Sequence, residues 1–556
     1  MECSCRRRTD RGEDLAFWAG ALLVGALVVS LPAWTFAFPG GMLTMGHDIA
    51  FHMLRIEGIK DGLLAGQLPV RVNPVWFHGY GMPTGIFYPD IFLYPFAFLR
   101  MTGVSLWAAW AAFLTLANLV TAFSAWWAFS SLTRSWKIGA VAALFYLVFL
   151  YRLVDLYARA AGGEILAMAF FPGALIFSWL TLRRSPSCWV PAVLFTTCVL
   201  QSHIITSLLL LVADIAMMVV CFQRFWQEEV RRAVAKAVSF IVVLNLWFYA
   251  PLLYFHTHMD YVMKGVGHND IVGAVRSLRA LDFYMGSAVL LVLVGILAFY
   301  AYHRRRLPKP FWMLVLLSAS ILILTVSHKP WKLLGHAAGV LQFPFRLGVF
   351  PAVFLSAALA IALAGIRHKK VLCGLLILCC LANLHWVEWN NYRIPFSHEP
   401  QHGMFSWKVP EQDGKRWLEE RGILYYRDYM DASGGTVIRP EEASDSSVHP
   451  ADRILGTMQK GGDVVAKFEE GAGGWIQMPM LWYMGYAAQD AETGGRYAVR
   501  KDESGRVSVC LPPEAGIVHV WYEGLPWFHF TDLISWFGLF FFLHAAVRIW
   551  RKNQQI

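Results

Sequence analysis

Charged residues are scarce in this chain of 556 residues. Asp, Glu, Lys and Arg together make up 15% of the sequence, whereas a soluble domain carries about a quarter. Hydrophobic residues make up 57%, and the mean hydropathy is +0.46. This balance excludes an ordinary soluble protein and predicts a polytopic α-helical membrane protein.

Several motifs are also missing. The nine cysteines are scattered, mostly in or beside apolar segments, which excludes a disulfide framework. The chain has no P-loop and no glycine-rich nucleotide fingerprint, so a nucleotide-driven pump is disfavoured. The net charge of +10 comes from short basic clusters between apolar segments, as in cytoplasmic loops. We therefore expect no nucleic-acid partner.

Apolar segments recur along the chain and predict about twelve membrane spans. Basic clusters at alternate loops, at the N-terminus and in the C-terminal tail place both termini in the cytoplasm. The expected spans lie at about 15–37, 104–132, 138–151, 165–182, 188–203, 205–222, 237–255, 311–326, 346–365, 371–387 and 527–547, and one more ends at the basic run 304–306.

Three regions follow from this topology. Residues 1–387 form a transmembrane domain whose first extracytoplasmic loop is 38–90. Residues 388–525 form an extracytoplasmic domain, in which polar and apolar residues alternate between turn signals, as in 507–511 and 517–522. This alternation predicts antiparallel strands and a mainly-β, sandwich-like domain. Residues 526–556 supply the final span and a basic cytoplasmic tail.

The stretch Met45–Arg55 directly after the first span combines polar and apolar residues at helical spacing. As a helix, it puts Asp48, His52 and Arg55 on one face, at i, i+4 and i+7. The face would present a carboxylate, an imidazole and a guanidinium to one cavity. Alternatively, Asp48 caps the helix N-terminus and has no chemical role.

Further ionisable residues gather at the predicted outer ends of the spans: Asp155, Arg159, Glu164, His203 and Arg346. Ionisable groups at the edge of the hydrocarbon are costly and mark cavities or functional sites. For each of them, a purely structural role also stays open. Arg159 and Glu164 would form a solvated loop pair, Arg346 would extend to the lipid headgroups, and His203 would bond a neighbouring helix.

These features resemble the GT-C superfamily of polyprenyl-phosphate-dependent glycosyltransferases. More narrowly, the chain resembles bacterial membrane proteins named after a 6-pyruvoyl-tetrahydropterin-synthase-related domain, with the YfhO-like proteins as near relatives. The likeness is sharpest over residues 46–100. It is carried by His47-Asp48-x3-His52-x2-Arg55, Gly66-Gln67-Leu68-Pro69-Val70-Arg71, Gly79-Tyr80-Gly81-x4-Phe87-Tyr88-Pro89 and Leu341-Gln342-Phe343-Pro344-Phe345-Arg346.

The resemblance implies a GT-C-like fold and transfer of a sugar from a polyprenyl-phosphate donor to an extracytoplasmic glycan, teichoic acid or lipid. It also implies a bacterial cytoplasmic membrane with the active site on its outer face. Asp48 takes the position of the superfamily's catalytic or metal-binding carboxylate, with His52 in support. Substrate or phosphate contacts would come from His47, Arg55, Arg159, Glu164, His203 and Arg346. No cofactor is fixed, and a divalent metal on Asp48 and Glu164 stays open.

Two other classes of function compete with this hypothesis. A lipid or polysaccharide transporter would need polar groups on both sides of the membrane midplane, whereas these residues gather on the outer side. A non-catalytic scaffold of an envelope-assembly complex also stays open, because a single carboxylate is a thin catalytic signature.

Overall fold

The chain is a polytopic helical membrane protein, as predicted. Seven helices in the described part are long and apolar enough to cross a membrane: Leu15–Trp34, Leu106–Thr133, Gly162–Arg183, Glu228–His258, Lys309–Val326, Pro344–Ala362 and Pro526–Ile549. The computed structural model describes residues 2–35, 43–44, 48–183, 185–261, 297, 300–301, 306–363, 406–407, 454–469, 473–514 and 516–554.

These helices match seven of the predicted spans, and three other predictions differ in form. The span predicted at 138–151 is a pair of helices, Trp136–Leu147 and Leu150–Arg159, bent by 48°. The spans predicted at 188–203 and 205–222 are shorter apolar helices, Pro186–Leu200 and Ile204–Val220. The span ending at 304–306 and the span at 371–387 lie outside the described residues, so the total of about twelve stays a prediction.

Helix α5 (Leu106–Thr133) is central to the bundle and packs against α1 (Glu2–Thr35), α6 (Trp136–Leu147) and α8 (Gly162–Arg183). It begins after Ser105, whose hydroxyl oxygen accepts a hydrogen bond from the backbone N–H of Ala108 at 3.2 Å. Small side chains let neighbouring backbones approach closely. The buried alanines of α5 are Ala109, Ala111, Ala117, Ala122, Ala125 and Ala128.

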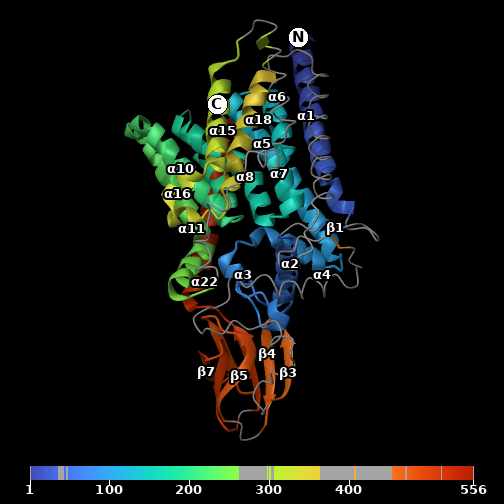
Figure 1. Cartoon of the computed structure of the whole chain (residues 1–556), viewed down its shortest axis with the longest axis vertical. Coiled ribbons are helices and arrows are strands. Elements are labelled where there is room, and N and C mark those ends of the chain that lie inside the picture. Colours follow the sequence, from blue (N-terminus) through green and yellow to red (C-terminus); the bar gives the residue numbers. More distant parts are fainter. Residues whose placement is uncertain are drawn as a thin grey trace.

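The other helices surround this centre (Figure 1). α9 and α10 pack on α8, α11 packs on α9 and α22, and α15 packs on α18. Their bounds are α9 (Trp189–Leu200), α10 (Ile204–Val220), α11 (Glu228–His258), α15 (Lys309–Val326), α18 (Val349–Leu363) and α22 (Pro526–Gln554). Shorter segments are α7 (Leu150–Leu153), η3 (Val154–Arg159), η4 (Pro186–Cys188), η5 (Phe222–Trp226), α16 (His328–Leu334), α17 (His336–Gly339) and η6 (Pro344–Gly348).

The loop after α1 folds into short helices at one end of the bundle. Its main helix, α2 (Ile49–Leu64), is buried on every side from Ile49 to Ile59, because it packs on α4 and α5. Gly58 is needed there, since a Cβ at that position would lie 1.7 Å from the Asn73 side chain that crosses α2. The other helices of this loop are η1 (Trp76–Gly79), α3 (Thr84–Phe87), η2 (Ile91–Leu93) and α4 (Tyr94–Met101).

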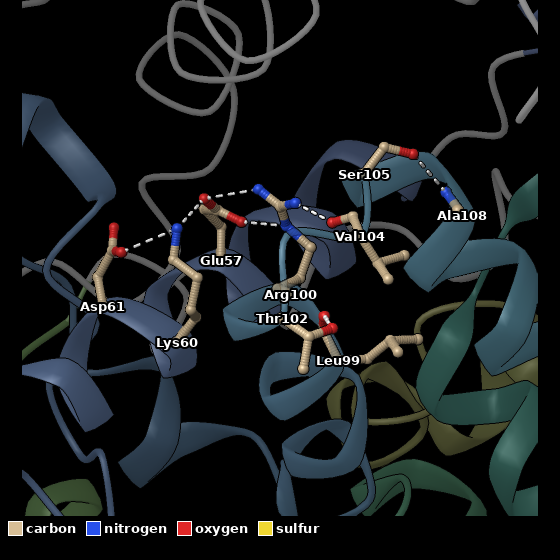
Figure 2. Close-up of polar contacts among 9 residues, drawn as sticks. All are labelled: Glu57, Lys60, Asp61, Leu99, Arg100, Thr102, Val104, Ser105 and Ala108. Atoms are coloured by element: carbon tan, nitrogen blue, oxygen red, sulfur yellow. Dashed lines mark hydrogen bonds and ion pairs between the residues drawn. The ribbon is translucent and has the colours of Figure 1, made fainter.

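A cluster of charges fastens α2 to α4. Nε of Arg100 donates to Oε2 of Glu57 at 2.8 Å, and Nζ of Lys60 binds Oε1 of the same carboxylate (Figure 2). Lys60 also pairs with Asp61 at 3.0 Å. Burial raises the pKa of Glu57, but hydrogen bonds and charge from Arg100 and Lys60 outweigh it, so the pKa lies below its ordinary value. Sequence reasoning did not single out this cluster.

The C-terminal domain is a single antiparallel sheet of seven strands in the order β3-β4-β9-β6-β7-β8-β5. Strand β7 pairs with both β6 and β8, so hydrogen bonding continues from edge to edge. Side chains from β4 and β5, near opposite edges, share one core that includes Val464 and Met478. The sheet is therefore curved around its core. The prediction of a sandwich of two packed sheets is wrong, because the domain is one continuous sheet. The strands are β3 (Ile454–Lys460), β4 (Asp463–Phe468), β5 (Gly474–Leu481), β6 (Tyr486–Asp490), β7 (Arg496–Lys501), β8 (Arg506–Leu511) and β9 (Ile517–Tyr522).

The sheet contacts the loop that contains α2, at the end away from most of the bundle (Figure 1). The backbone N–H of Leu481 donates to the carbonyl of Tyr80 at 2.9 Å, and the Tyr483 hydroxyl donates to the carbonyl of Gly81 at 3.3 Å. On the bundle side, Arg71 of the loop pairs with Asp532 of α22 at 2.7 Å. The loop is thus held between the sheet and the final helix. A second strand pair, β1 (Leu43–Thr44) with β2 (Ser406–Trp407), also joins distant parts of the chain.

We expect Glu57→Gln to destabilise the protein by about 3 kcal/mol, because Arg100 loses its counter-charge where little water can replace it and Lys60 keeps only Asp61. Thermal unfolding of the purified protein in detergent measures the change. The lowered pKa of Glu57 adds a pH dependence: its stabilisation is present above the usual glutamate pKa and is lost as pH falls through the lowered value. The difference between wild type and variant should shrink in acid.

Glu228→Gln is the matched control. Glu228 is also paired with an arginine four residues along its helix, but its side chain is 63% exposed. Exposed pairs contribute little, so we expect a change within about 1 kcal/mol. Equal melting temperatures for Glu57→Gln and wild type would show that the cluster does not fasten α2.

Candidate functional site

Asp48 stands at the N-cap position of α2 but does not use its side chain as a cap. Its backbone N–H donates to the carbonyl of Arg159 at 2.9 Å, which fixes the start of α2 against η3. Asp48 as a whole residue is half-buried. Burial raises its pKa above the ordinary value, the charges of Arg159 and Arg346 oppose this, and Glu164 adds to it. The side chain is therefore available for a role other than capping.

Arg159 is positioned by a turn of π-helix. The segment η3 (Val154–Arg159) is π-helical and ends at Ala160, whose backbone is left-handed with φ 51°. Such turns are rare and often occur at functional sites. Nη1 of Arg159 donates to Asp155 in the same turn and to Oε2 of Glu164 at 2.9 Å. The guanidinium thus bridges two carboxylates.

Glu164 in the first turn of α8 is the meeting point of three side chains. It accepts hydrogen bonds from the hydroxyl of Tyr151 and from Arg159, and Nε of Arg346 lies 3.7 Å from its Oε2. The alternative in which Arg159 and Glu164 form a solvated loop pair is therefore contradicted: their side chains are 8% and 2% exposed. Both are enclosed by the helices after the first loop.

Arg346 is buried with spare hydrogen-bonding capacity. It lies in η6, its guanidinium carbon is 5.5 Å from the centre of the Phe343 ring, and the residue is 7% exposed. Its Nε and Nη1 atoms have no hydrogen-bond partner among the described residues. This burial contradicts the alternative in which Arg346 extends to lipid headgroups. An arginine left in this state is suited to bind an anion.

His52 and Arg55 point into the same region from α2, as the spacing predicted. Nη1 of Arg55 lies 3.2 Å from Nδ1 of His52, and its guanidinium carbon lies 4.3 Å from the centre of the Tyr88 ring. Nη2 of Arg55 donates to the backbone carbonyls of Tyr88 and Pro89. Both Nη atoms of Arg55 thus contact protein groups, whereas Nη1 of Arg346 makes no hydrogen bond to a described residue.

His203 lies between α9 and α10 and caps α10. Its Nδ1 accepts from the backbone N–H of Thr206 at 3.3 Å and lies 2.8 Å from the Thr206 hydroxyl. The His203 and His52 rings both lie against Tyr88, with ring centres 6.0 Å and 5.8 Å away. Capping was not among the roles weighed for His203.

The structure brings Asp48, His52, Arg55, Arg159, Glu164, His203 and Arg346 into one connected cluster, which we call the outer cluster. His47 lies outside the described residues. Tyr88, Tyr151 and Asp155 also belong to the cluster. Asp155 was among the outer ionisable residues noted from sequence, whereas Tyr88 and Tyr151 were given no role. The one available signal was the pair Gly162-Gly163 before Glu164, since adjacent glycines often mark close packing.

The carboxylates of the outer cluster do not form a metal site in the described part of the chain. No group of three or more His, Cys, Asp or Glu side chains gathers there to hold an ion. Glu164 is already bonded to Tyr151 and Arg159. The residues present therefore do not fit the metal alternative.

We expect Gly163→Ala to disturb the outer cluster. A Cβ at Gly163 would lie 2.2 Å from the Tyr88 hydroxyl oxygen and 2.8 Å from the carbonyl of Ser202, so Tyr88 must move. Overpacking of this kind costs about 1–3 kcal/mol. Thermal unfolding measures this loss of stability. Gly20→Ala is the control, because nothing lies within 4 Å of a Cβ at Gly20. Equal stability of the two variants would contradict the close contact at Tyr88.

Comparison with solved structures finds only distant likenesses. The chain has 16% identity and a TM-score of 0.43 to the arabinofuranosyltransferase AftD from Mycobacteria, over 67% of this chain and 27% of that one. It has 13% identity and a TM-score of 0.39 to the archaeal oligosaccharyltransferase AglB from Archaeoglobus fulgidus in complex with an inhibitory peptide and a dolichol-phosphate, over 75% of this chain and 61% of that one. The chain thus spans less than two thirds of either protein.

A search of curated proteins finds no match to the sequence. A family profile does match, over residues 86–392, which is more than half of the chain. The family is described as a 6-pyruvoyl-tetrahydropterin synthase related domain of membrane proteins. The narrower resemblance drawn from the sequence motifs is therefore confirmed. The chain belongs to the family of membrane proteins with a 6-pyruvoyl-tetrahydropterin synthase related domain.

Proposed function

We propose that this protein is a GT-C-type glycosyltransferase. It moves a sugar from a polyprenyl-phosphate-linked donor to an extracytoplasmic glycan, teichoic acid or lipid. The observation that carries the proposal is the Asp48 carboxylate, which makes no capping bond although it occupies the N-cap position. It lies within the electrostatic influence of Arg159, Arg346 and Glu164. A raised pKa and an enclosed position suit a general base.

In the proposed reaction, Asp48 accepts the proton of the acceptor hydroxyl. The hydroxyl oxygen forms a bond to the anomeric carbon of the donor sugar, and the bond from that carbon to the phosphate oxygen breaks. The electron pair of the broken bond leaves with the polyprenyl phosphate. Negative charge therefore grows on the phosphate as the reaction proceeds, and a cation held beside it lowers the barrier.

Arg346 is the best candidate for that cation. Arg159 is bonded to Asp155 and Glu164, and Arg55 donates to backbone carbonyls. Arg346 has only the longer 3.7 Å contact to Glu164, and its Nε and Nη1 make no hydrogen bond to a described residue. A guanidinium matches the oxygens of a phosphate group in both shape and charge. Arg159 and Glu164 then act as the frame that keeps Arg346 and Asp48 in place.

The proposed setting is the outer face of a bacterial cytoplasmic membrane, with both termini in the cytoplasm. This orientation rests on the basic clusters at alternate loops. The donor's polyprenyl chain would lie in the lipid and its phosphate at the membrane edge, where the outer cluster lies in this topology. The β domain would bind or cover the acceptor, since it contacts the loop that follows α2 at Tyr80 and Gly81.

We expect Asp48→Asn to lower sugar transfer by about 10²–10⁴-fold, because the amide cannot accept the acceptor proton. The measurement is transfer of radiolabelled sugar from a synthetic lipid-linked donor by purified protein in liposomes. Asp61→Asn is the matched control, since it removes the same charge from the far end of α2 and should leave the rate within about twofold. Full activity of Asp48→Asn would remove this residue from catalysis.

A second expectation concerns pH. Because burial raises the pKa of Asp48, the fraction of ionised base falls at a higher pH than for an ordinary aspartate. The rate should therefore rise with pH through this raised pKa and then level off. Residual activity of Asp48→Asn should lack this acidic limb. The same limb in both proteins would assign it to another group.

A further inference from the structure

The side chain of His52 is held in one tautomer. Nη1 of Arg55 lies 3.2 Å from Nδ1 of His52, and a guanidinium can only donate hydrogen bonds. Nδ1 must therefore accept, and the ring proton stays on Nε2. Burial, the charge of Arg55 and the nearby His203 lower the pKa of His52 well below its ordinary value, so the ring is neutral.

His203 is held in the same tautomer by a different device. The backbone N–H of Thr206 donates to Nδ1 of His203 at 3.3 Å, and a backbone amide cannot accept. The Thr206 hydroxyl, 2.8 Å from the same nitrogen, can donate to it as well. The proton of His203 is therefore on Nε2, as in His52.

Neither Nε2–H group has an acceptor in the described part of the chain. His52 is 2% exposed and His203 is 6% exposed, but neither Nε2 atom is among the fully buried side-chain atoms that lack a hydrogen-bond partner. An acceptor from outside the described residues can therefore reach both N–H groups. The two donors lie on either side of Tyr88 and interact electrostatically with each other.

Arg346 provides the charge that the two histidines lack. It interacts electrostatically with His203, and its Nε lies 3.7 Å from Oε2 of Glu164, but neither Nε nor Nη1 makes a hydrogen bond to a described residue. The group formed by the three side chains therefore offers donors only: two neutral N–H groups and one guanidinium. Its complement is a ligand rich in acceptors that carries negative charge. A phosphate ester has both properties.

We propose that His52, His203 and Arg346 form a subsite for the phosphate of a lipid phosphate ester, in which both histidines act as fixed Nε2–H donors. This rests on the proposed function and deepens it. The role of His52 becomes that of a positioning residue that does not exchange a proton. Its Arg55 partner keeps Nδ1 occupied, and a neutral ring beside a guanidinium is a poor base.

Paired substitutions at each histidine test the donor role. Glutamine places an amide N–H₂ near the position of Nε2, whereas asparagine places its amide near Nδ1 and has nothing at Nε2. We expect His203→Gln to bind a short-chain polyprenyl phosphate within about threefold of wild type. We expect His203→Asn to bind about 10-fold more weakly or worse, the value of a hydrogen bond to a charged group. We expect the same pattern at His52: His52→Gln should bind within about threefold of wild type, and His52→Asn about 10-fold more weakly or worse.

The asparagine variants are also controls for folding. Asparagine is a strong N-cap residue, so His203→Asn retains the bond from Thr206 and the start of α10. Thermal unfolding and gel filtration check that each full-length variant is folded in detergent. Affinity is measured by calorimetry with the same lipid. Equal losses in the glutamine and asparagine variants, or no loss in either, overturn the donor role.

Competition identifies the part of the ligand that binds. Displacement of the lipid by inorganic phosphate supports a subsite for the phosphate group, whereas displacement by the matching polyprenyl alcohol with phosphate inert overturns it. Transfer assays separate this inference from the proposed function. Phosphate binding with the expected pattern but no sugar transfer keeps the subsite and removes the transferase. Sugar transfer by wild type, with unchanged lipid affinity in all four variants, keeps the transferase and overturns the subsite.

Discussion

The ion pairs of Arg159 hold the outer cluster together. Charges removed from water are costly, so each must be compensated nearby. Arg159 compensates both Asp155 in its own π-helical turn and Glu164 in α8, while its carbonyl accepts the backbone N–H of Asp48. One residue thereby fixes three elements relative to each other. Because Glu164 is hydrogen-bonded to Arg159 and Tyr151, Arg346 contacts it only at the longer distance of 3.7 Å.

Much of this could be predicted from the sequence where the signals are local. The spacing of Asp48, His52 and Arg55 correctly predicted a helix that presents them together, and long apolar runs predicted the spans that the structure describes. Motifs around residues 46–100 predicted the family that the profile match confirms. Each of these signals depends on neighbours within about two helical turns or on the length of one apolar run.

The remainder depends on contacts between distant residues, which spacing does not encode. Arg55 was expected to bind substrate, which stays a prediction, and its contacts with the carbonyls of Tyr88 and Pro89 could not be foreseen from spacing. Glu57 and Arg100 lie 43 positions apart, and only the fold makes them partners. The alternation in the C-terminal strands predicted antiparallel pairing but not whether the pairs join into one sheet. That outcome depends on β7 pairing on both of its sides.

The contact between the first loop and the sheet has a consequence for how this architecture diversifies. Tyr80 and Gly81 offer backbone carbonyls to Leu481 and Tyr483, so the fit depends on backbone position on both sides. A sheet exchanged between relatives by recombination would fail to dock unless the matching loop came with it. The two segments lie about 400 positions apart in the chain, yet they would have to be inherited as one unit.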